Sequence, residues 1–379
     1  MTTFSMARQG LVGAGLLLAG CTAPYSPPSS GSPPSYLAVE GFINSRGVST
    51  FALTRTYAIA SAAAPPTETK ATVYVEEDAG PRYTLREGTA GIYTSDNLTL
   101  NPAKKYRLHL TTRAGQEYAS DFVPVKTTPP IDTVAWGTAS NELTVSVSSH
   151  DASRATQYYR WEYTETWEIA SPLIPSIEYA NGRLRPITVP YPSLCWSTSL
   201  ATAIQLASTT ALSQDAVTNY PLRRLPSTSP QLLRKYSILV RQHALTKEEY
   251  TYWDLLRKNT ESIGTLFDPQ PSQLTGNVHC LSAPTELALG YVGVHSLAEK
   301  RIFISRAQLP KAWTPLTGYE SCLPPDTVRA GDEVTFSFKR LLPLNAEYRN
   351  GGLIGYSAAT PDCIDCRTRG TAVRPSFWR

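Results

Sequence analysis

Two cysteines near the C-terminus could take part in three kinds of chemistry. Cys363 and Cys366 are separated by two residues in the sequence PDCIDCRTRG, a spacing typical of redox centres, zinc sites and disulfide-rich segments. A redox pair is expected at the start of a helix, which lowers the pKa of a thiol, but Pro361 precedes the pair and a Thr-Arg-Gly-Thr run follows it. A zinc site would recruit His279 and Cys280, whose spacing is irregular, and no second Cys-x-x-Cys occurs. We therefore predict disulfide bonds.

The cysteine count limits these disulfides. The sequence contains six cysteines, and Cys21 belongs to a separate motif at the N-terminus. The other five allow at most two disulfides and leave one thiol unpaired, and the sequence does not assign the connectivity. We expect Cys363 or Cys366 to pair with Cys322 or Cys195. The candidates for disulfide bonding are Cys195, Cys280, Cys322, Cys363 and Cys366.

The N-terminus predicts export and a lipid anchor. A short leader with one cation, Arg8, precedes an apolar stretch over residues 11–19, which is too short for a membrane-spanning helix and is typical of a signal peptide. The stretch ends Leu-Ala-Gly-Cys at Cys21, which resembles the lipobox of bacterial lipoproteins. We therefore predict a signal peptide over residues 1–20 and acylation of Cys21. The Pro/Ser-rich residues 21–35 are predicted to form a tether, and export places the cysteines in an oxidising compartment.

The usual catalytic motifs do not occur in the sequence. It contains no GxSxG, HExxH, P-loop or GxGxxG motif. His279 beside Cys280 could form a Cys–His nucleophile, but Cys280 is expected to supply a disulfide instead. The net charge is +4 and only 17% of the residues are charged, with no basic cluster, which argues against nucleic-acid binding. We predict a protein that is not an enzyme and needs no cofactor and no metal ion.

The pattern of short alternating runs predicts a mainly β fold. Over residues 36–126 these runs are separated by turn residues, which favours an N-terminal immunoglobulin-like or transthyretin-like β-sandwich. In the run KYRLHLTT, Tyr106, Leu108 and Leu110 alternate with polar residues, so one face is predicted to be buried and the other, with His109, to be solvated. The sequence TTPPID (127–132) is predicted to be a domain boundary because two prolines remove backbone donors.

Residues 131–379 are predicted to form a second, larger β-sandwich-like domain. It would contain a loop-rich insertion over residues 170–235, marked by its many prolines, and a Cys-containing C-terminal segment. One clear amphipathic helix is predicted over residues 246–263, with Thr246 and Glu249 as a capping box and Gly264 as its C-cap. Strands are predicted over residues 143–149, 158–169, 237–245, 301–305 and 333–340.

The strand predicted at residues 158–169 is rich in aromatic side chains. Glu162 and Glu165 fall on opposite faces of it, so a paired-carboxylate site of the glycosidase kind is not predicted there. The apolar face is interpreted as sandwich core, and the alternative is an aromatic binding surface. Its members are Tyr159, Trp161, Tyr163, Trp167 and Ile169, opposite Arg160, Glu162, Thr164 and Glu168.

Several of these segments together resemble a known family. It is a Bacteroidetes lipoprotein family, number 4249 in the "domain of unknown function" series, and the similarity extends from about Leu37 to Trp378. The resemblance implies a lipid-anchored outer-membrane protein whose partner is a TonB-dependent receptor barrel, and it supplies no catalytic or ligand residues. It does not decide between the cell surface and the periplasmic face, since Thr22-Ala23-Pro24 after Cys21 lacks the acidic residues common in surface-exported lipoproteins. The segments are residues 195–196, 237–261, 266–280, 301–305 and 363–378.

Three functions follow as expectations. The first is a non-enzymatic accessory or binding protein that helps a TonB-dependent receptor to take up an unknown nutrient ligand. The second is a structural or adhesive lipoprotein of the cell envelope. The third is a hydrolase, which would require a pocket that gathers His243 or His279 with a carboxylate and a nucleophile.

Overall fold

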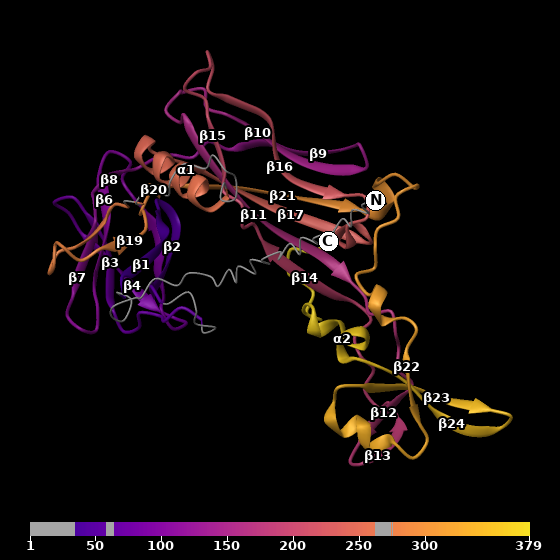
Figure 1. Cartoon of the computed structure of the whole chain (residues 1–379). Coiled ribbons are helices and arrows are strands. Elements are labelled where there is room, and N and C mark those ends of the chain that lie inside the picture. The colour runs from indigo at the N-terminus through magenta and orange to yellow at the C-terminus, as the bar shows by residue number, and fades with distance from the viewer. Residues whose placement is uncertain (1–34, 58–63, 262–273, 275) are drawn as a thin grey trace, which may run out of the picture.

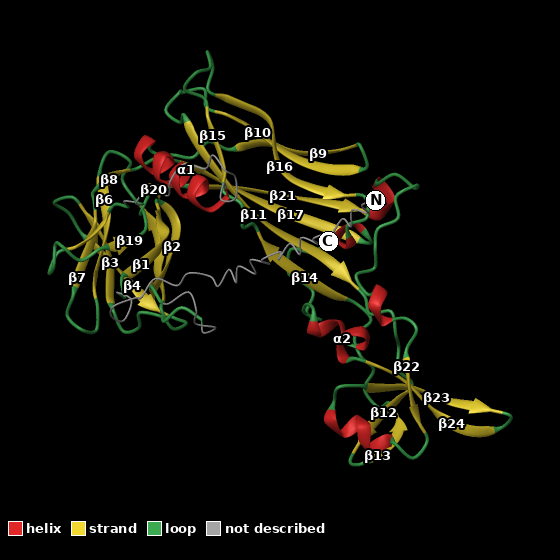
Figure 2. Ribbon diagram, in the orientation of Figure 1, coloured by secondary structure: helices red, strands yellow, loops and turns green. Residues whose placement is uncertain are grey.

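The computed structural model describes residues 35–57, 64–261, 274 and 276–379. Within them the chain is mainly β-sheet, as predicted, and it forms three bodies in an elongated arrangement (Figures 1 and 2). None of the described helices is long and apolar enough to cross a membrane. The predicted signal peptide and Cys21 lie outside the described residues. The bodies are the first sandwich (35–125 and 276–296), the second sandwich (131–169, 195–261 and 297–313) and the C-terminal body (170–194 and 314–368).

The first sandwich is an 11-stranded sheet around one hydrophobic core. Its strand order is β18-β7-β6-β3-β4-β5-β2-β1-β19, with β20 paired to β1 and β8 paired to β6. The side chains that the strands turn inward form this core, in which Phe51, Tyr93 and Tyr106 are fully enclosed. The strands are β1 (Leu37–Asn44), β2 (Arg46–Arg55), β3 (Thr72–Glu77), β4 (Arg82–Glu87), β5 (Ile92–Thr99), β6 (Lys105–Thr111), β7 (Glu117–Ser120), β8 (Val123–Pro124), β18 (Val278–Cys280), β19 (Ala288–Leu289) and β20 (Val294–His295).

Two predictions for this region are wrong. The strands at 278–295, assigned from the sequence to the second domain, complete the first sandwich: β19 and β20 pair in parallel with β1, and Figure 1 shows these orange strands among the indigo ones. His109, predicted on a solvated face, is only 4% exposed. Its ring stacks on Tyr74 with the ring centres 4.6 Å apart, and its Nε2 lies 2.7 Å from Glu117 Oε1. Neighbours on the adjacent strands therefore cover that face.

The second sandwich packs two antiparallel sheets around a core rich in aromatic residues. One sheet has the order β16-β10-β9, and the other has the order β14-β11-β17-β21 with β15 also paired to β11. The predicted loop-rich insertion 170–235 nevertheless contributes β14, β15 and β16 as integral strands of these sheets. The strands are β9 (Ile131–Ala139), β10 (Glu142–His150), β11 (Tyr158–Ile169), β14 (Cys195–Leu200), β15 (Gln205–Ser208), β16 (Ala216–Pro226), β17 (Lys235–Ala244) and β21 (Leu297–Ser305).

The longest helix among the described residues lies where the two sandwiches meet. Helix α1 (Lys247–Glu261) confirms the predicted helix, and the hydroxyl of Thr246 accepts a hydrogen bond from the Glu249 amide at 3.1 Å. The predicted C-cap, Gly264, lies outside the described residues. Figure 2 shows α1 in red between the first sandwich and the sheet that contains β11 and β17. The helix therefore forms one side of the junction between the bodies.

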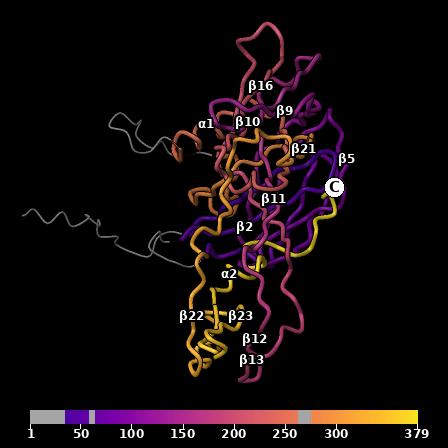
Figure 3. Tube along the Cα trace, turned by 90° about the vertical axis from the view of Figure 1, so that its right-hand side faces the viewer, coloured from indigo at the N-terminus to yellow at the C-terminus, as the bar shows by residue number. Residues whose placement is uncertain are grey.

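The C-terminal body projects away from the sandwiches (Figure 3). It contains the β12–β13 hairpin, the sheet β22-β24-β23, and two small hydrophobic clusters. Residues 333–340, predicted as a strand, contain the 3-10 helix Glu333–Phe338, in which only Phe336 is buried. The remaining elements are β12 (Ile177–Ala180), β13 (Arg183–Pro186), β22 (Asp326–Arg329), β23 (Leu342–Arg349), β24 (Gly352–Ala359), α2 (Pro361–Ile364) and the 3-10 helices Pro230–Leu232, Arg306–Gln308, Glu320–Cys322, Glu333–Phe338 and Cys366–Thr368.

Two disulfides hold this body in place. Cys363 bonds to Cys322 within it, and Cys366 bonds to Cys195 on β14 of the second sandwich. This confirms the predicted disulfides, although Cys363 lies in the short helix α2, which the sequence did not predict. The two cysteines of the Cys-x-x-Cys pair bond to partners in different parts of the chain and not to each other. The disulfides compensate for hydrophobic clusters too small to hold the body on their own.

Candidate functional site

A cleft of about 500 Å³ lies between the first sandwich, the second sandwich and helix α1. Its volume falls within the range of small-molecule sites, which often occur where domains meet. The residues that line it come from β1 (Glu40, Gly41, Phe42), β2 (Thr50, Ala52), β11 (residues 160–164), the segment 200–204, β17 (Arg241) and α1 (Glu249, Trp253).

The alternation of β11 gives the cleft its polar wall. Arg160, Glu162 and Thr164 share one face of the strand, and the cross-strand register places Arg160 opposite His243 and Glu162 opposite Arg241. The opposite face of β11 points into the core of the second sandwich, as predicted for its aromatic side chains. The face that the sequence marks as polar is therefore covered by a second body.

Arg160 is nearly buried and has two partners. Its side chain is 9% exposed, its Nη1 lies 2.6 Å from Glu162 Oε1, and its guanidinium carbon lies 4.2 Å from the ring centre of Trp253. Burial alone would raise the pKa of the Glu162 carboxyl, but the nearby His243 and Arg160 outweigh it and hold that pKa well below its ordinary value. Glu162 is therefore an ionised group at the edge of the cleft.

Two fully buried histidines lie behind this pair. The ring centre of Phe42 is 4.3 Å from that of His295 and 5.1 Å from that of His243, and the two histidine rings are 5.0 Å apart. His243 Nε2 lies 3.8 Å from Glu162 Oε2, too far for a hydrogen bond. Burial, together with the Arg160 guanidinium, lowers the pKa of His243 to about 3. His243 is therefore neutral at pH 7.

Glu249 turns its carboxylate inward from the first turn of α1. It is 3% exposed, and its Oε1 lies 3.6 Å from His295 Nε2. Its side chain does not complete the predicted capping box, because it packs over Gly293, where an added Cβ atom would overlap the carboxylate. Only the absence of a side chain at Gly293 leaves room for this carboxylate.

Buried polar atoms without hydrogen-bond partners concentrate around this cleft. Among the described residues, 11 buried side-chain nitrogen or oxygen atoms have no hydrogen-bond partner, and six of them belong to this group. Buried polar atoms are otherwise paired in the great majority of cases, so each exception needs a reason. The six are Arg160 Nε, His243 Nδ1, His243 Nε2, Glu249 Oε2, Trp253 Nε1 and His295 Nε2.

Hydrogen bonds at Thr128 join the chain segments that cross the junction between the two sandwiches. Thr128 donates its amide to Ser296 Oγ at 2.8 Å, and the Thr128 hydroxyl accepts the Ala244 amide at 3.0 Å. These contacts join the segment before β9, the start of β21 and the end of β17. Both bonds join a backbone amide to a side-chain oxygen, and the second fixes the backbone of Ala244, the residue after His243.

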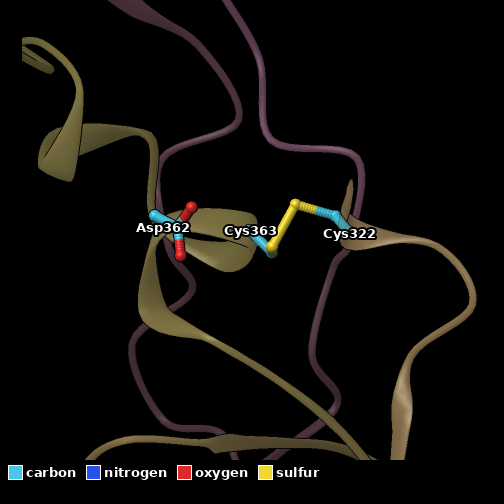
Figure 4. A group of neighbouring side chains, drawn as sticks. All are labelled: Cys322, Asp362 and Cys363. Atoms are coloured by element: carbon cyan, nitrogen blue, oxygen red, sulfur yellow. A yellow bond between two sulfur atoms is a disulfide. The ribbon is translucent and has the colours of Figure 1, made fainter. Parts of the chain in front are cut away.

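The histidines and glutamates of the cleft do not converge as a metal centre. In the described part of the chain, only Cys322, Asp362 and Cys363 place three candidate ligand atoms within 4.8 Å of one another. Figure 4 shows that the two sulfur atoms of this group are joined to each other. They are not thiolates, so this group does not offer the ligands of a zinc site.

The Cys–His pair that was considered as an alternative, and not predicted, is not formed. His279 and Cys280 are consecutive residues of β18 and point to opposite faces. His279 is exposed and lies 3.2 Å from Asp121 Oδ1, whereas Cys280 is buried in the core of the first sandwich and is a free cysteine. The leftover thiol of the cysteine count is therefore Cys280, which was considered for a disulfide.

Sequence reasoning found only part of this site. It singled out His243 and placed Arg160 and Glu162 on one face, but it missed Glu249 as a cleft residue, and it missed Trp253 and His295 altogether. Glu249 and Trp253 are four positions apart on α1, so helical spacing indicates that they share a face. No local pattern reveals that this face meets His295, because β20 reaches the junction from the first sandwich.

The fold and the cleft define a protein of tandem β-sandwiches with a polar site between them. The family model of the Domain of unknown function (DUF4249) matches residues 22–301, and the chain belongs to this family. All the cleft residues lie within the matched segment, whereas most of the C-terminal body lies beyond it. No curated protein matches the chain.

Three solved structures show a distant likeness. A DUF4785 family protein from Legionella pneumophila is 12% identical, with 54% of this chain and 51% of that chain covered and a TM-score of 0.20. The adhesin InvE of Yersinia pseudotuberculosis is 10% identical, with 84% and 73% covered and a TM-score of 0.17. A putative carbohydrate binding protein from Bacteroides uniformis is 10% identical, with 56% and 90% covered and a TM-score of 0.15. The chain spans about half the length of the Legionella protein.

Proposed function

We propose that the protein is a lipid-anchored, non-enzymatic binding protein of the outer membrane. It holds a small nutrient molecule in the cleft between its sandwiches and delivers it to a TonB-dependent receptor. The observation that carries the proposal is the cleft of about 500 Å³, around which six buried polar atoms lack partners. The lipobox-like sequence before Cys21 and the Pro/Ser-rich residues after it support the anchor and the tether.

The contents of the cleft favour binding over hydrolysis. His243 lies near the carboxylate of Glu162, and a histidine and a carboxylate are two of the three groups that the hydrolase hypothesis requires. Among the described residues, however, no Ser, Thr or Cys side chain is hydrogen-bonded to either nitrogen of His243. With its pKa lowered by burial, His243 serves better as a neutral hydrogen-bonding group than as a base exposed to water.

The receptor partnership is tested by purification from the native host. The tagged protein is extracted in mild detergent and captured, and the co-purifying proteins are quantified by mass spectrometry. We expect one TonB-dependent receptor in near-equal amount. A variant with Cys21→Ser, which removes the acylated thiol, serves as the control and should lose the receptor together with the membrane. Recovery of the wild-type protein alone would contradict the partnership.

A structural or adhesive role is the second candidate, because the C-terminal body exposes large apolar side chains at its far end. Scattered apolar residues on a surface need no explanation, but a group of them often marks an interaction site. Deletion of the gene separates the two roles: a growth defect on a particular nutrient supports uptake, and altered adhesion or envelope integrity supports a structural role. The exposed residues are Val334, Phe338, Tyr348, Leu353 and Ile354.

A further inference from the structure

The unpartnered atoms around the cleft differ in charge as well as in position. The Glu249 carboxylate forms no ion pair with a Lys or Arg among the described residues, and its only charged-group neighbour is His295 at 3.6 Å. Its Oε2 is buried and accepts no hydrogen bond. A buried carboxylate without a cation is strongly disfavoured, so this position calls for a positive group that donates hydrogen bonds.

Next to Glu249, two unpaired donors require a hydrogen-bond acceptor. Arg160 Nε and Trp253 Nε1 are both hydrogen-bond donors, and neither has an acceptor. The Arg160 guanidinium already lies over the Trp253 ring at 4.2 Å, so the two donors belong to one packed unit. Trp253 follows Glu249 by four residues on α1, which puts their Cβ atoms about 5–6 Å apart. An acceptor group is therefore needed roughly one helical turn from the position that needs a cation.

We infer that the cleft binds a small zwitterion, a free amino acid or a short peptide. Its ammonium group would be held by Glu249 and its carboxylate by Arg160 and Trp253. The inference rests on the proposed function and gives that function a ligand class. A neutral sugar would leave the Glu249 charge uncompensated, and a simple amine would leave the two donors unpaired.

The balance of charges in the lining agrees with this assignment. Arg160 pairs with Glu162 at 2.6 Å and Arg241 with Glu299 at 2.8 Å. Among the described residues, the lining carboxylates without a Lys or Arg partner are the buried Glu249 and the exposed Glu40. The neutral His243, beside Glu162, can accept or donate as the ligand requires. The cleft therefore offers two carboxylates without a Lys or Arg partner, of which only Glu249 is buried, and a set of uncharged or already paired hydrogen-bonding groups.

The experiment measures binding to the detergent-solubilised full-length protein by titration calorimetry. The probes are the twenty common amino acids, trialanine, trialanine acetylated at its amino group, trialanine amidated at its carboxyl group, and maltotriose. We expect at least one amino acid or trialanine to bind at one site. Blocking the amine or the carboxyl should weaken that binding at least about tenfold, because a hydrogen bond to a charged group contributes roughly 1.5–3 kcal/mol.

Two variants locate the binding. Glu249→Gln keeps the shape of the side chain but removes its charge, and should weaken the zwitterion at least about tenfold. The matched control is Glu248→Gln, the same change one position earlier on α1, where the side chain is exposed and does not line the cleft. Its affinity should stay within about twofold of the wild type. The blocked probes act on the wild-type protein, so the test holds even where a variant fails to fold.

The outcomes separate the ligand class from the proposed function. Binding of maltotriose in place of amino acids overturns the zwitterion and leaves a binding cleft in place. Equal affinity for free and acetylated trialanine, or for the wild type and Glu249→Gln, also overturns it, as does the lack of binding by every probe. The receptor co-purification decides the uptake partnership independently of these results.

Discussion

The two faces of the sheet that contains β11 and β17 differ in whether their buried polar groups have hydrogen-bond partners. On the core face, the side chain of Gln242 is fully buried, and both its oxygen and its nitrogen form hydrogen bonds. Its oxygen accepts from Trp161 Nε1 at 2.8 Å, and its nitrogen donates to the Pro129 carbonyl at 2.9 Å and to Ser149 Oγ at 2.8 Å. This network joins both sheets of the second sandwich.

Glu165 behaves in the same way on that face. It is buried, and its Oε1 accepts hydrogen bonds from Arg223 Nε at 3.0 Å and from the Tyr236 hydroxyl at 2.7 Å. Burial, and then the Glu165 carboxylate, raise the pKa of Tyr236, which keeps this hydroxyl a donor. The carboxylate that interrupts the apolar pattern of β11 is thus fixed by its own partners.

On the cleft face, His243 and Glu249 are equally buried, but each has side-chain polar atoms without a hydrogen-bond partner. His243 follows Gln242 directly in β17, yet neither of its ring nitrogens has a partner. Glu249 has one carboxylate oxygen without a partner, in contrast to the paired Glu165. Polar groups that serve stability are satisfied within the fold, and departures from that rule concentrate where a protein does its work. Changes on the two faces should therefore affect different measurements.

The largest expected effect comes from breaking the core network. Gln242→Ala leaves the Trp161 indole nitrogen without an acceptor and frees two groups on the facing sheet. We expect the free energy of unfolding to fall by about 3 kcal/mol, since each unsatisfied buried group costs roughly 1–3 kcal/mol. Denaturant titration followed by tryptophan fluorescence measures it. Gln157→Ala, at an exposed position, is the control and should change little. An equal loss for both variants would contradict the role assigned to the network.

The core face of this sheet could be predicted from the sequence, and the cleft could not. Alternation over residues 158–169 and 237–245 predicts the two strands and their apolar faces because each face is set by neighbours two residues away. The cleft depends on how far-separated segments meet. β20 lies about 250 residues after β1 in the chain and pairs with it, which brings His295 against Phe42.

Local patterns were also misleading where tertiary contacts overrode them. In residues 333–338, alternation suggested a strand, but Val334 and Phe338 are exposed and the segment coils into a 3-10 helix. For Glu249, the spacing from Thr246 predicted a complete capping box. The Thr246 half forms, but the carboxylate turns towards His295. A pattern specifies an element more firmly than it specifies what that element contacts.

An effect of intermediate size is expected from pH. The folded pKa of His243 is about 3, below the ordinary value of 6.5, so the unfolded chain takes up a proton between these values and the folded chain does not. The contribution of His243 to stability is therefore lost as the pH falls below about 6.5. Arg160, Glu162 and His295 face the ring and remain in place. Between pH 7 and pH 5, the free energy of unfolding of the wild type should fall by about 2 kcal/mol more than that of the His243→Gln variant.

The measurement is denaturant unfolding of both proteins at pH 7, 6 and 5. His109, whose pKa is also lowered by burial, is present in both proteins and cancels in the difference. If both proteins lost the same amount of stability, His243 would take up a proton in the folded state as readily as in the unfolded chain. The ring would then be accessible to water and not buried.

The smallest change in stability is expected for one of two matched substitutions, one on each face of the sheet. Glu249→Gln and Glu165→Gln make the same change on the cleft face and on the core face. Without ligand, the first should raise the free energy of unfolding by about 1 kcal/mol, because it removes a buried carboxylate that has no Lys or Arg partner. The second removes the charge that pairs with Arg223 and should cost about 2 kcal/mol. Thermal and denaturant unfolding compare the two directly. If Glu249→Gln destabilised the protein as much as Glu165→Gln does, Glu249 would be a structural residue, and its buried carboxylate would no longer indicate a ligand.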